Sequence, residues 1–455
     1  MESSVSAHTL QGLSSSSALV TIESALRSGA ILAHKDGNHG ALYPKVDEFG
    51  PVGVPFLTAK LLSGGEVDIA AAPRLPDEHA DKLRLGFVQP GDVLLSHNAT
   101  IGRVAIVPPF AGRLLLGTSL TYFRVNREVI SPRYLAAYFT GEHFQSQLRA
   151  VMSHTTRNQV PISAQRKLSI VLPPIEIQET IASTLGAFDD RIALLRETNA
   201  TLEAIAQALF KSWFVDFDPV RAKQQCQSPA GMDEATVALF PGSFEDSALG
   251  LVPKGWCQGS VGDFAQMHRG SVNPGGSCDT WFEHFSLPAF DAGQMPVREL
   301  GAEIKSNKTS VPRDAVLLSK LNPHIPRVWL PVDAGPHAVC STEFLVFVPA
   351  AGASREFAYC SFVAAPFQER LRQLVTGTSN SHQRVKPDSV LTLSTVVPPS
   401  PALEAFTFVV CPIFERVGRN RLQAQTLATL RDTLLPRLIS GQLRLPEAEA
   451  LLAQP

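Results

Sequence analysis

The chain contains one long internal duplication, and this repeat restricts the fold more than any other feature of the sequence. Residues 169–214 align with residues 394–439 at a constant offset of 225 residues and without a gap. In these segments VLPP faces VVPP, DRI faces ERV, and TLEAIAQALF faces TLATLRDTLL. Upstream, QPGDVLLS at 89–96 resembles VPRDAVLLS at 311–319. Solenoid repeats are far shorter than this period, so the sequence predicts two copies of one unit.

Each copy has the same order of parts: a globular stretch, a Pro-Pro stop and a long helix. Short β-like runs such as LTYFRV and EFLVFVP, broken by Gly and Pro, predict mixed domains of ~150 residues. The predicted fold class is α+β, with two domains of mixed α/β fold related by pseudo-two-fold symmetry and separated by two long antiparallel coiled-coil helices. The predicted boundaries are 1–175 for the first domain, 176–215 for the first helix, 216–250 for a linker, 251–400 for the second domain, 401–442 for the second helix and 443–455 for a tail.

Both predicted helices carry apolar residues at alternating spacings of four and three, which is the seam of a coiled coil. The first seam holds Ile181, Leu185, Phe188, Ile192, Leu195, Asn199, Leu202, Ala206, Leu209 and Trp213, and the second holds Phe406, Val410, Ile413, Val417, Asn420, Ala424, Leu427, Arg431, Leu434 and Leu438. We predict that the helices pair with each other. The alternative is that each helix packs separately on its own domain. One Asn on each seam would fix the register at a cost in stability, and Pro412 is expected to kink or delay the second helix.

The stretch ALFKSWFVDFDPVRAK at 208–223 places Asp216 and Asp218 among aromatic residues. Acid–base and two-metal sites need more ligands than these two carboxylates supply. The pair is therefore expected to cap the segment or to form ion pairs with Arg221 or Lys223. Six scattered cysteines without a C-x-x-C spacing argue against a zinc site or a disulfide framework and suit a reducing cytoplasm. No catalytic residue and no metal ligand is predicted.

Motifs of common enzymes are missing from the sequence. It has no Walker A, Gly-x-Ser-x-Gly or His-Glu-x-x-His sequence. VPPF at 107–110 resembles the Pro-Pro-aromatic motif of amino methyltransferases, but Val107 cannot hydrogen-bond an exocyclic amine. The first residues do not form a signal peptide, and no apolar run approaches the roughly 20 residues of a membrane helix. We expect a cytoplasmic protein without membrane contact that binds rather than catalyses.

The formal net charge of −2 does not point to nucleic acid, so a DNA partner would have to bind local patches. Residues 301–330 combine cations suited to phosphates with amides suited to base edges. SHNATIGR (96–103), SHTTRNQ (153–159) and TGTSNSHQR (376–384) have the same character. A plain solvated loop is the alternative for each residue. The candidate DNA-binding residues are Asn98, Arg103, Thr156, Arg157, Asn158, Lys305, Lys308, Lys320, Asn322, Arg327, Asn380, His382 and Arg384.

Three segments resemble the specificity subunit of type I restriction-modification systems. They are the run from LPPIEIQ to DPVRAK (172–223), LGLVPKGW (249–256) and LRDTLLPRLISGQLRLPEAE (430–449). KSNKTSVPRDAVLLSKLNPHIPRVW resembles the second target-recognition domain of one branch of that family. The resemblance extends over nearly the whole chain and is weakest in the first ~30 residues.

The resemblance implies a subunit without catalysis of its own. Its two target-recognition domains would each read half of a bipartite double-stranded DNA target. Its helices would separate the domains and dock two methyltransferase subunits, and restriction subunits would then join. S-adenosylmethionine, ATP and Mg would be used by the partners, with no cofactor bound by this chain. The candidate subunit-interface residues are Phe188, Leu195, Asn199, Leu209, Trp213, Phe214, Asn420, Leu427, Leu434 and Leu438.

Two other classes of protein stay open as alternatives. A stand-alone adenine DNA methyltransferase would need the methyl-donor and Pro-Pro-aromatic motifs that the sequence lacks. A coiled-coil adaptor that binds only protein would explain the helices but not the polar segments. Binding to DNA with and without a methyltransferase subunit would separate these possibilities.

Overall fold

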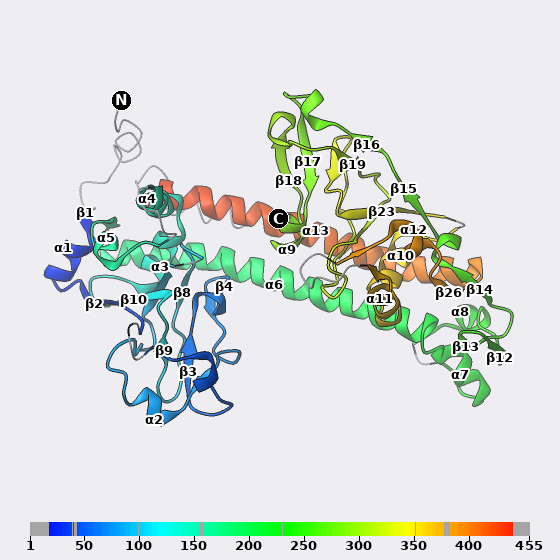
Figure 1. Ribbon diagram of the computed structural model, residues 1–455, viewed down its shortest axis with the longest axis horizontal. Helices are drawn as coiled ribbons and strands as arrows, with labels where there is room; N and C mark the ends of the chain where they lie inside the picture. Colours follow the sequence, from blue (N-terminus) through cyan, green and yellow to red (C-terminus); the bar gives the residue numbers. More distant parts are fainter. Residues whose placement is uncertain are drawn as a thin grey trace. The chain divides into compact units, whose positions relative to one another are not determined.

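The computed structural model describes residues 18–38, 40, 43–98, 100–153, 159–229, 231–350, 352–376 and 383–439. The chain divides into two compact units, of which unit 1 comprises Met1–Ala193 with Ala424–Pro455 and unit 2 comprises Leu194–Gln423. Two long helices, α6 (Ile175–Phe214) and α13 (Ser400–Ile439), each supply residues to both units (Figure 1). No helix in the described part of the chain is long and apolar enough to cross a membrane.

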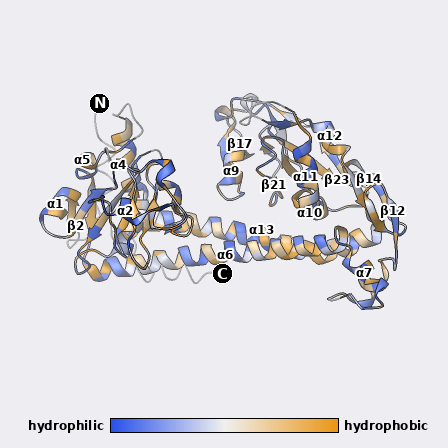
Figure 2. Cartoon of the chain, turned by 60° about the horizontal axis from the view of Figure 1, so that its bottom comes forward, coloured by the Kyte–Doolittle hydropathy of each residue, from blue (hydrophilic) through white to orange (hydrophobic). Residues whose placement is uncertain are grey.

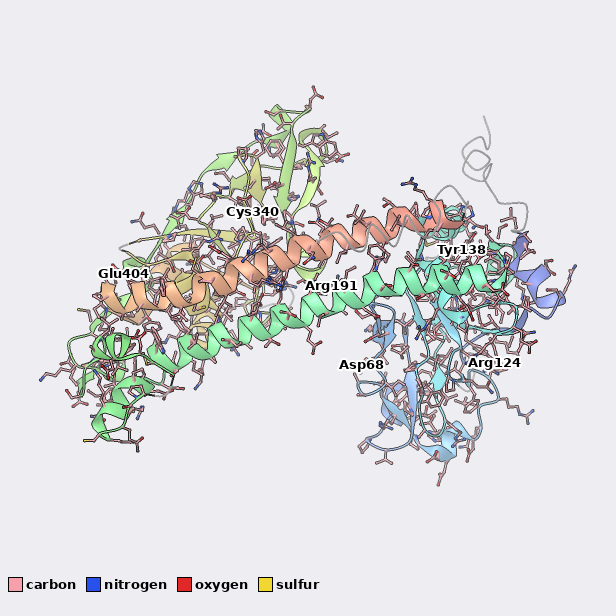
Figure 3. All side chains as sticks on the ribbon, turned by 180° about the vertical axis from the view of Figure 1, so that it is seen from behind. Asp68, Arg124, Tyr138, Arg191, Cys340 and Glu404 are labelled. Atoms are coloured by element: carbon pink, nitrogen blue, oxygen red, sulfur yellow. The ribbon has the colours of Figure 1, made fainter. Side chains whose placement is uncertain are left out.

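Unit 1 is built on a four-stranded antiparallel sheet of order β2-β10-β7-β8. The strands are β2 (Ile31–Asp36), β10 (Leu120–Val125), β7 (Val93–Ser96) and β8 (Val104–Ile106). Arg124 belongs to β10 and is labelled in Figure 3. Its Nε and Nη2 donate to the buried Asp92 carboxylate at 2.9 and 2.7 Å. A buried carboxylate needs such a bidentate partner to offset its lost hydration.

Helices and smaller sheets complete unit 1. Phe123, Tyr134, Phe139 and Phe144 are fully buried where helices pack on the main sheet. The remaining elements are β1 (Ala18–Thr21) paired with β11 (Ser169–Leu172), β3 (Val54–Leu57) between β6 (Arg74–Leu75) and β9 (Leu115–Leu116), β4 (Leu62–Ser63) paired with β5 (Glu66–Val67), α1 (Ile22–Arg27), α2 (Asp77–Ala80), α3 (Pro132–Thr140), α4 (Glu142–Ser153) and α5 (Ile162–Gln165).

Unit 2 repeats the same design. Its four-stranded antiparallel sheet has the order β15-β23-β20-β21, with β15 (Ala265–His268), β23 (Phe344–Pro349), β20 (Val316–Ser319) and β21 (Val328–Trp329). Two helices again follow the longest strand, α10 (Arg355–Val363) and α11 (Ala365–Gln373), and α12 (Pro387–Leu391) stands where α5 stands in unit 1. The strand pair β14 (Cys257–Ser260) and β26 (Ser394–Val397) matches β1 and β11. The predicted α+β fold is confirmed.

Unit 2 also holds a five-stranded sheet of order β16-β19-β22-β17-β18. Its strands are β16 (Ser271–Val272), β19 (Lys308–Ser310), β22 (Ala338–Cys340), β17 (Trp281–Phe285) and β18 (Val297–Leu300), with α9 (Leu287–Asp291) following β17. A short pair, β24 (Val375–Thr376) and β25 (Arg384–Val385), lies before α12.

The long helices pair within each unit, as the seams predict. In unit 2 the Nδ2 of Asn420 donates to Oδ1 of Asn199 at 2.8 Å, and the ring of Phe406 lies 5.9 Å from that of Trp213. These contacts make the two helices antiparallel there. In unit 1 Arg431 forms an ion pair with Asp189. Figure 2 shows apolar and polar residues alternating along both helices.

Two details of the helices differ from the prediction. Helix α13 begins at Ser400 and continues through Pro412, so Pro412 does not delay it. Pro412 is exposed, and a carbonyl that loses its amide partner on the wet face of a helix can bind water instead. On α6, Phe210 is buried where the seam predicted Leu209, which is only partly buried. The reason is that the end of α6 packs on the globular part of unit 2 as well as on α13.

Residues 216–250, predicted as a linker, form short elements that pack on the core of unit 2. These are α7 (Asp218–Gln224), α8 (Glu234–Ala238) and the hairpin of β12 (Phe244–Ser247) with β13 (Gly250–Pro253). Phe217, Val220 and Phe240 are buried there. Phe217 has a φ of 56°, so the chain turns sharply between α6 and α7.

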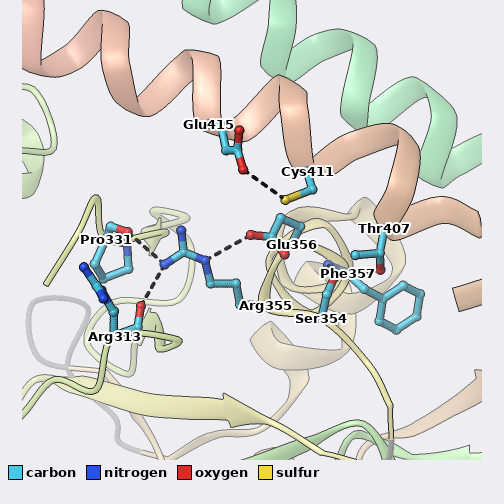
Figure 4. Close-up of polar contacts among 9 residues, drawn as sticks. All are labelled: Arg313, Pro331, Ser354, Arg355, Glu356, Phe357, Thr407, Cys411 and Glu415. Atoms are coloured by element: carbon cyan, nitrogen blue, oxygen red, sulfur yellow. Dashed lines mark hydrogen bonds and ion pairs between the residues drawn. The ribbon is translucent and has the colours of Figure 1, made fainter. Parts of the chain in front are cut away.

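The start of α10 is joined to α13 by a hydrogen bond between two hydroxyl groups, and Figure 4 labels both residues. Ser354 caps α10 by accepting from the amide of Phe357 at 3.1 Å, and its Oγ also receives the hydroxyl of Thr407 at 3.0 Å. Arg355 donates from Nη1 to the carbonyl of Arg313 at 2.8 Å. The globular part of unit 2 is thereby fixed to its own stretch of α13.

Candidate nucleic-acid interface

In each unit, one strand of the main sheet ends at a serine that is followed by a polar loop. Residues 97–103 follow Ser96 at the end of β7, and residues 320–327 follow Ser319 at the end of β20. The amide of Ser96 donates to the carbonyl of Arg103 at 2.8 Å, and that of Ser319 to the carbonyl of Arg327 at 2.9 Å. Both loops are therefore closed by the same backbone contact.

A second segment meets each loop in the same manner. In unit 1 the amide of Val160 donates to the carbonyl of His97 at 2.9 Å, and Gln159 forms a β-bridge with Asn98. In unit 2 the amide of Val385 donates to the carbonyl of Lys320 at 3.0 Å. We call residues 97–103 with 159–160 loop pair 1, and residues 320–327 with 383–385 loop pair 2. The fold thus brings together segments that the sequence singled out separately.

Two candidates of unit 1, Asn98 and Arg103, lie on loop pair 1. Asn98 is partly buried. Arg103 is exposed, yet its Nη1 donates to the carbonyls of Ala59 and Leu62 at 3.2 and 3.1 Å. Arg103 therefore ties the loop to the neighbouring segment. Three further candidates of this unit, Thr156, Arg157 and Asn158, lie outside the described residues.

Four candidates belong to loop pair 2. Lys320 is partly buried, and Asn322 has a left-handed φ of 51°, with an Oδ1 that has no partner among the residues described. Arg327 donates to both carboxylate oxygens of Asp291, at 2.7 and 2.9 Å. Arg384 forms the same bidentate contact with Glu343, at 3.1 and 2.8 Å. Asn380 and His382 lie outside the described residues.

Lys305 and Lys308 belong to a different part of unit 2. Lys308 is in β19 of the five-stranded sheet, and Lys305 lies three residues before it and is exposed. Lys308 is buried, and its ammonium donates to Oγ of Ser306 at 2.6 Å. A DNA phosphate would have to compete with that local contact.

The arginines of loop pair 2 are held charged by their carboxylate partners. The hydrogen bond to Asp291 raises the pKa of Arg327, and the one to Glu343 raises the pKa of Arg384. Arg384 in turn lowers the pKa of Glu343. The positive charge of each guanidinium is balanced by a carboxylate in the free chain. Contact with a DNA phosphate therefore requires the phosphate to replace that carboxylate.

Two buried histidines lie at the base of loop pair 1. Burial lowers the pKa of His34 to about 4 and also lowers the pKa of His97. Both are about 2–3 % exposed. Neither ring nitrogen of His97 has a hydrogen-bond partner among the described residues. Both rings are consequently neutral at pH 7, and their charging would oppose the fold.

Unit 1 is therefore expected to lose stability as the pH falls below 6.5. A histidine whose folded pKa is lowered binds its proton only in the unfolded chain between pH 6.5 and about 4, so stability falls through that window. From His34 alone we expect a loss of about 1 kcal/mol between pH 7 and pH 5.5. Urea unfolding across this range measures it. His34→Met, which cannot titrate, should flatten the dependence, and an unchanged slope in that variant would contradict the assignment.

The aspartates of the aromatic stretch have structural partners. The Asp216 carboxylate forms an ion pair with Lys211, and its backbone carbonyl accepts from Nε of Arg221 at 2.8 Å. Asp218 begins α7, where a negative charge is favourable. Within the described ranges, no group of three or more His, Cys, Asp or Glu side chains is placed to hold a metal ion.

Most of the candidate subunit-interface residues on the two long helices are buried within the protein. Phe188, Leu195, Asn199, Trp213, Phe214, Asn420, Leu434 and Leu438 are buried, while Leu209 and Leu427 are partly buried. These side chains pair the helices and pack on the unit cores. A contact with another subunit stays a prediction for them.

The comparison of the two loop pairs identifies two residues, Gln159 and His97, that were not among the candidates from the sequence. Gln159 occupies the position of Arg384. Gln159 forms a β-bridge with Asn98, and Arg384 forms one with Leu321, which is the second residue of the corresponding loop. His97 likewise occupies the position of Lys320. The repeat offset of 225 residues leads from Arg384 to Gln159 and would have found it. The repeat offset does not lead from Lys320 to His97, because small insertions and deletions separate the two globular parts. Their equivalence follows only from the fold.

Comparison with known proteins finds a matching family model and two similar chains. Residues 49–204 match the family model of the type I restriction modification DNA specificity domain. The chain is 25% identical to the specificity subunit of the type I restriction enzyme MjaIX of Methanocaldococcus jannaschii, over 89% of this chain and 90% of that protein. It is 25% identical to the HindI specificity subunit of Haemophilus influenzae, over 78% and 87%.

Among solved structures, the comparison finds the S subunit of a type I restriction-modification system from M. genitalium. It has 13% identity and a TM-score of 0.49 and covers 94% of this chain and 96% of that one. Residues 49–204 thus match the type I restriction modification DNA specificity domain, and most of the chain is similar to specificity subunits of type I restriction enzymes.

Proposed function

We propose that the chain is the DNA-recognition subunit of a type I restriction-modification complex and reads a bipartite duplex target. The observation that supports this most is the presence of two equivalent polar loop pairs on duplicated domains. One domain reads one half-site and the other reads the second half-site. Loop pair 1 offers amides, and loop pair 2 offers two arginines and a lysine, so the two half-sites are expected to differ in sequence.

The chain supplies recognition, and partner subunits supply chemistry. Methyltransferase subunits bring S-adenosylmethionine and methylate adenine, and restriction subunits use ATP and Mg. The long helices serve as the docking surface. Leu194, Ile205, Phe408 and Leu422 are exposed on them, with Phe408 83 % exposed, and apolar side chains of this kind are suited to a protein partner.

A map of adenine methylation tests this function. The full chain alone, given S-adenosylmethionine and ATP, should neither methylate nor cut DNA. Combined with its methyltransferase subunits, it should direct methylation to one bipartite sequence. Methyl transfer by the chain alone would support a stand-alone methyltransferase, and a complex that methylates without sequence preference would support a protein-binding adaptor.

Lys320→Ala should relax reading of one half-site and leave the other unchanged. Among the described residues no carboxylate forms an ion pair with its side chain, unlike those of Arg327 and Arg384, so its removal disturbs the fold least. We expect a loss of about 1 kcal/mol in discrimination at one base pair, or a uniform loss of affinity if it contacts a phosphate. Methylation maps and binding at two salt concentrations separate these outcomes. Asn98→Ala changes a polar side chain of loop pair 1 instead and should affect the opposite half-site.

A further inference from the structure

A fully buried glutamine lies beneath loop pair 1. Gln165 ends α5 and is 0 % exposed. Its Oε1 accepts the hydroxyl of Thr121 at 3.0 Å and lies 3.0 Å from Nε2 of His34. Its Nε2 donates to the carbonyl of Val160 at 2.9 Å. All four polar groups of this network belong to unit 1.

The network ends on the backbone of a loop-pair residue. Val160 receives Gln165 at its carbonyl, while its amide donates to the carbonyl of His97 in the first loop. Both peptide groups of Val160 are thus fixed. Its carbonyl is bonded to Gln165, which is joined to the sheet, and its amide is bonded to the first loop. Thr121 is also anchored, because its hydroxyl lies 3.2 Å from the carbonyl of Leu95 in β7. The orientation of segment 159–160 therefore depends on Gln165.

The protonation state of the network follows from its partners. Oε1 of Gln165 is an acceptor, so His34 donates to it from Nε2. Nδ1 of His34 has no partner among the residues described. The charged or titratable groups that act on His34 are Arg166, His97 and Asp36. Burial outweighs them and keeps the ring neutral, which leaves Nε2–H as its one donor.

Unit 2 has the same fold without this network. In unit 1 His34 lies opposite Phe123 in the neighbouring strand, and in unit 2 Met267 lies opposite the equivalent Phe347. Met267 therefore occupies the position of His34. The pairs Leu120–Ser96 and Phe344–Ser319 likewise place Leu345 at the position of Thr121.

Val385 and Val160 make the same contact to their loops, and five residues after each come Val390 and Gln165. Val390 is fully buried, as Gln165 is. An apolar trio therefore suffices for the architecture. The polar trio of unit 1 is a costly alternative, because each member must be hydrogen-bonded where it is buried. Such networks fix one geometry more strictly than apolar packing does.

We propose that Gln165 is a positioning residue for DNA reading: it fixes segment 159–160 against residues 97–103 and thereby sets the discrimination of the half-site read by unit 1. This inference rests on the proposed function. Gln165 itself is buried and does not touch DNA. Its effect reaches the target through the carbonyl of Val160 and the neighbouring Gln159.

Three variants of the full chain, each assembled with methyltransferase subunits, test this role. Gln165→Val removes the donor to Val160. The triple variant His34→Met, Thr121→Leu, Gln165→Val installs the apolar trio of unit 2. Tyr134→Phe is the matched control, because it removes one buried hydrogen bond of unit 1, to the carbonyl of Val171 at 2.8 Å, away from the loops. Thermal unfolding gives the Tm, and base-resolved methylation gives the discrimination at each half-site.

The expected pattern separates positioning from stability. Gln165→Val should lower the Tm and reduce discrimination at one half-site by about tenfold, with the other half-site unchanged. The triple variant should recover most of the Tm, because no buried polar group is left unpaired, and it should still discriminate poorly. Tyr134→Phe should lower the Tm with normal discrimination at both half-sites.

Two results would overturn the proposal. One is discrimination that follows the Tm in all three variants, so that the triple variant regains both. The other is a Gln165→Val complex that reads both half-sites as the wild type does. A wild-type complex that methylates without any defined target would instead overturn the proposed function, and this inference with it. The wild-type map is therefore measured first.

Discussion

Trp213→Ala is expected to destabilise unit 2 by about 3–5 kcal/mol, the range for removing a large buried aromatic side chain. Trp213 is 4 % exposed. Its ring lies 5.4 Å from that of Phe240 and 5.9 Å from that of Phe406. It therefore joins α6 to α13 and to the segment of residues 216–250, and the cavity would open where all three meet. Equilibrium unfolding of the full chain in urea measures the loss.

Asp216→Asn is the control from the same stretch of sequence. The Asp216 carboxylate is 39 % exposed and makes one surface ion pair with Lys211, a contact worth less than about 1 kcal/mol. The hydrogen bond from Arg221 goes to the backbone carbonyl and survives the change. We expect near-normal stability and near-normal methylation by the assembled complex. A stable Asp216→Asn complex without activity would restore the idea of a catalytic aspartate.

The second large effect is expected at the paired asparagines of the helix seam. Asn420 is 1 % exposed and donates to Oδ1 of Asn199, whose Nδ2 donates to the carbonyl of Val417 at 3.1 Å. Asn420→Leu leaves the buried Oδ1 of Asn199 without its donor, and we expect a loss of about 2 kcal/mol. Urea unfolding of the single variant gives this value directly.

The double variant Asn199→Leu, Asn420→Leu tests the reason for that loss. Because both polar partners are replaced, no buried donor or acceptor of the pair stays unmatched, and most of the stability should return. The coupling energy from the double-mutant cycle should therefore be favourable and large. Losses that simply add would show that the contact between the two amides does not matter. Restored stability with a poorer unfolding cooperativity would fit the role of a buried Asn in fixing helix register.

Features that repeat along the sequence could be predicted well. The α+β class and the pairing of the helices follow from local periodicity and from the 225-residue offset, because burial on a helix face depends on residues three and four apart. The buried Asn199 and Asn420 were found in this way. The effect of Pro412 could not be predicted in this way. Pro412 lies on the exposed face of α13, and the spacing of the apolar residues does not report whether that face tolerates a missing hydrogen bond.

The partners of the polar candidates could not be predicted. Arg327 and Arg384 have the chemistry of DNA contacts, but each is engaged by a carboxylate 36 or 41 residues away. Gln165 and His34 are 131 residues apart. Such pairs arise from strand order, and neither composition nor spacing encodes them locally. The order of strands is also what brings Gln159 beside Asn98.

The segments of unit 1 are made at opposite ends of translation. Unit 2 is one continuous run, Leu194–Gln423, whereas unit 1 needs the last turns of α13 to cover Ile181, Leu185 and Phe188. Between residues 193 and 439 the ribosome adds 246 residues, which takes about 12–50 s at about 5–20 residues per second. During that time the nascent unit 1 exposes an apolar helix face. The N-terminal half of the protein is thus made first but completed last, and its uncovered apolar face is open to aggregation or to chaperone binding while the chain grows.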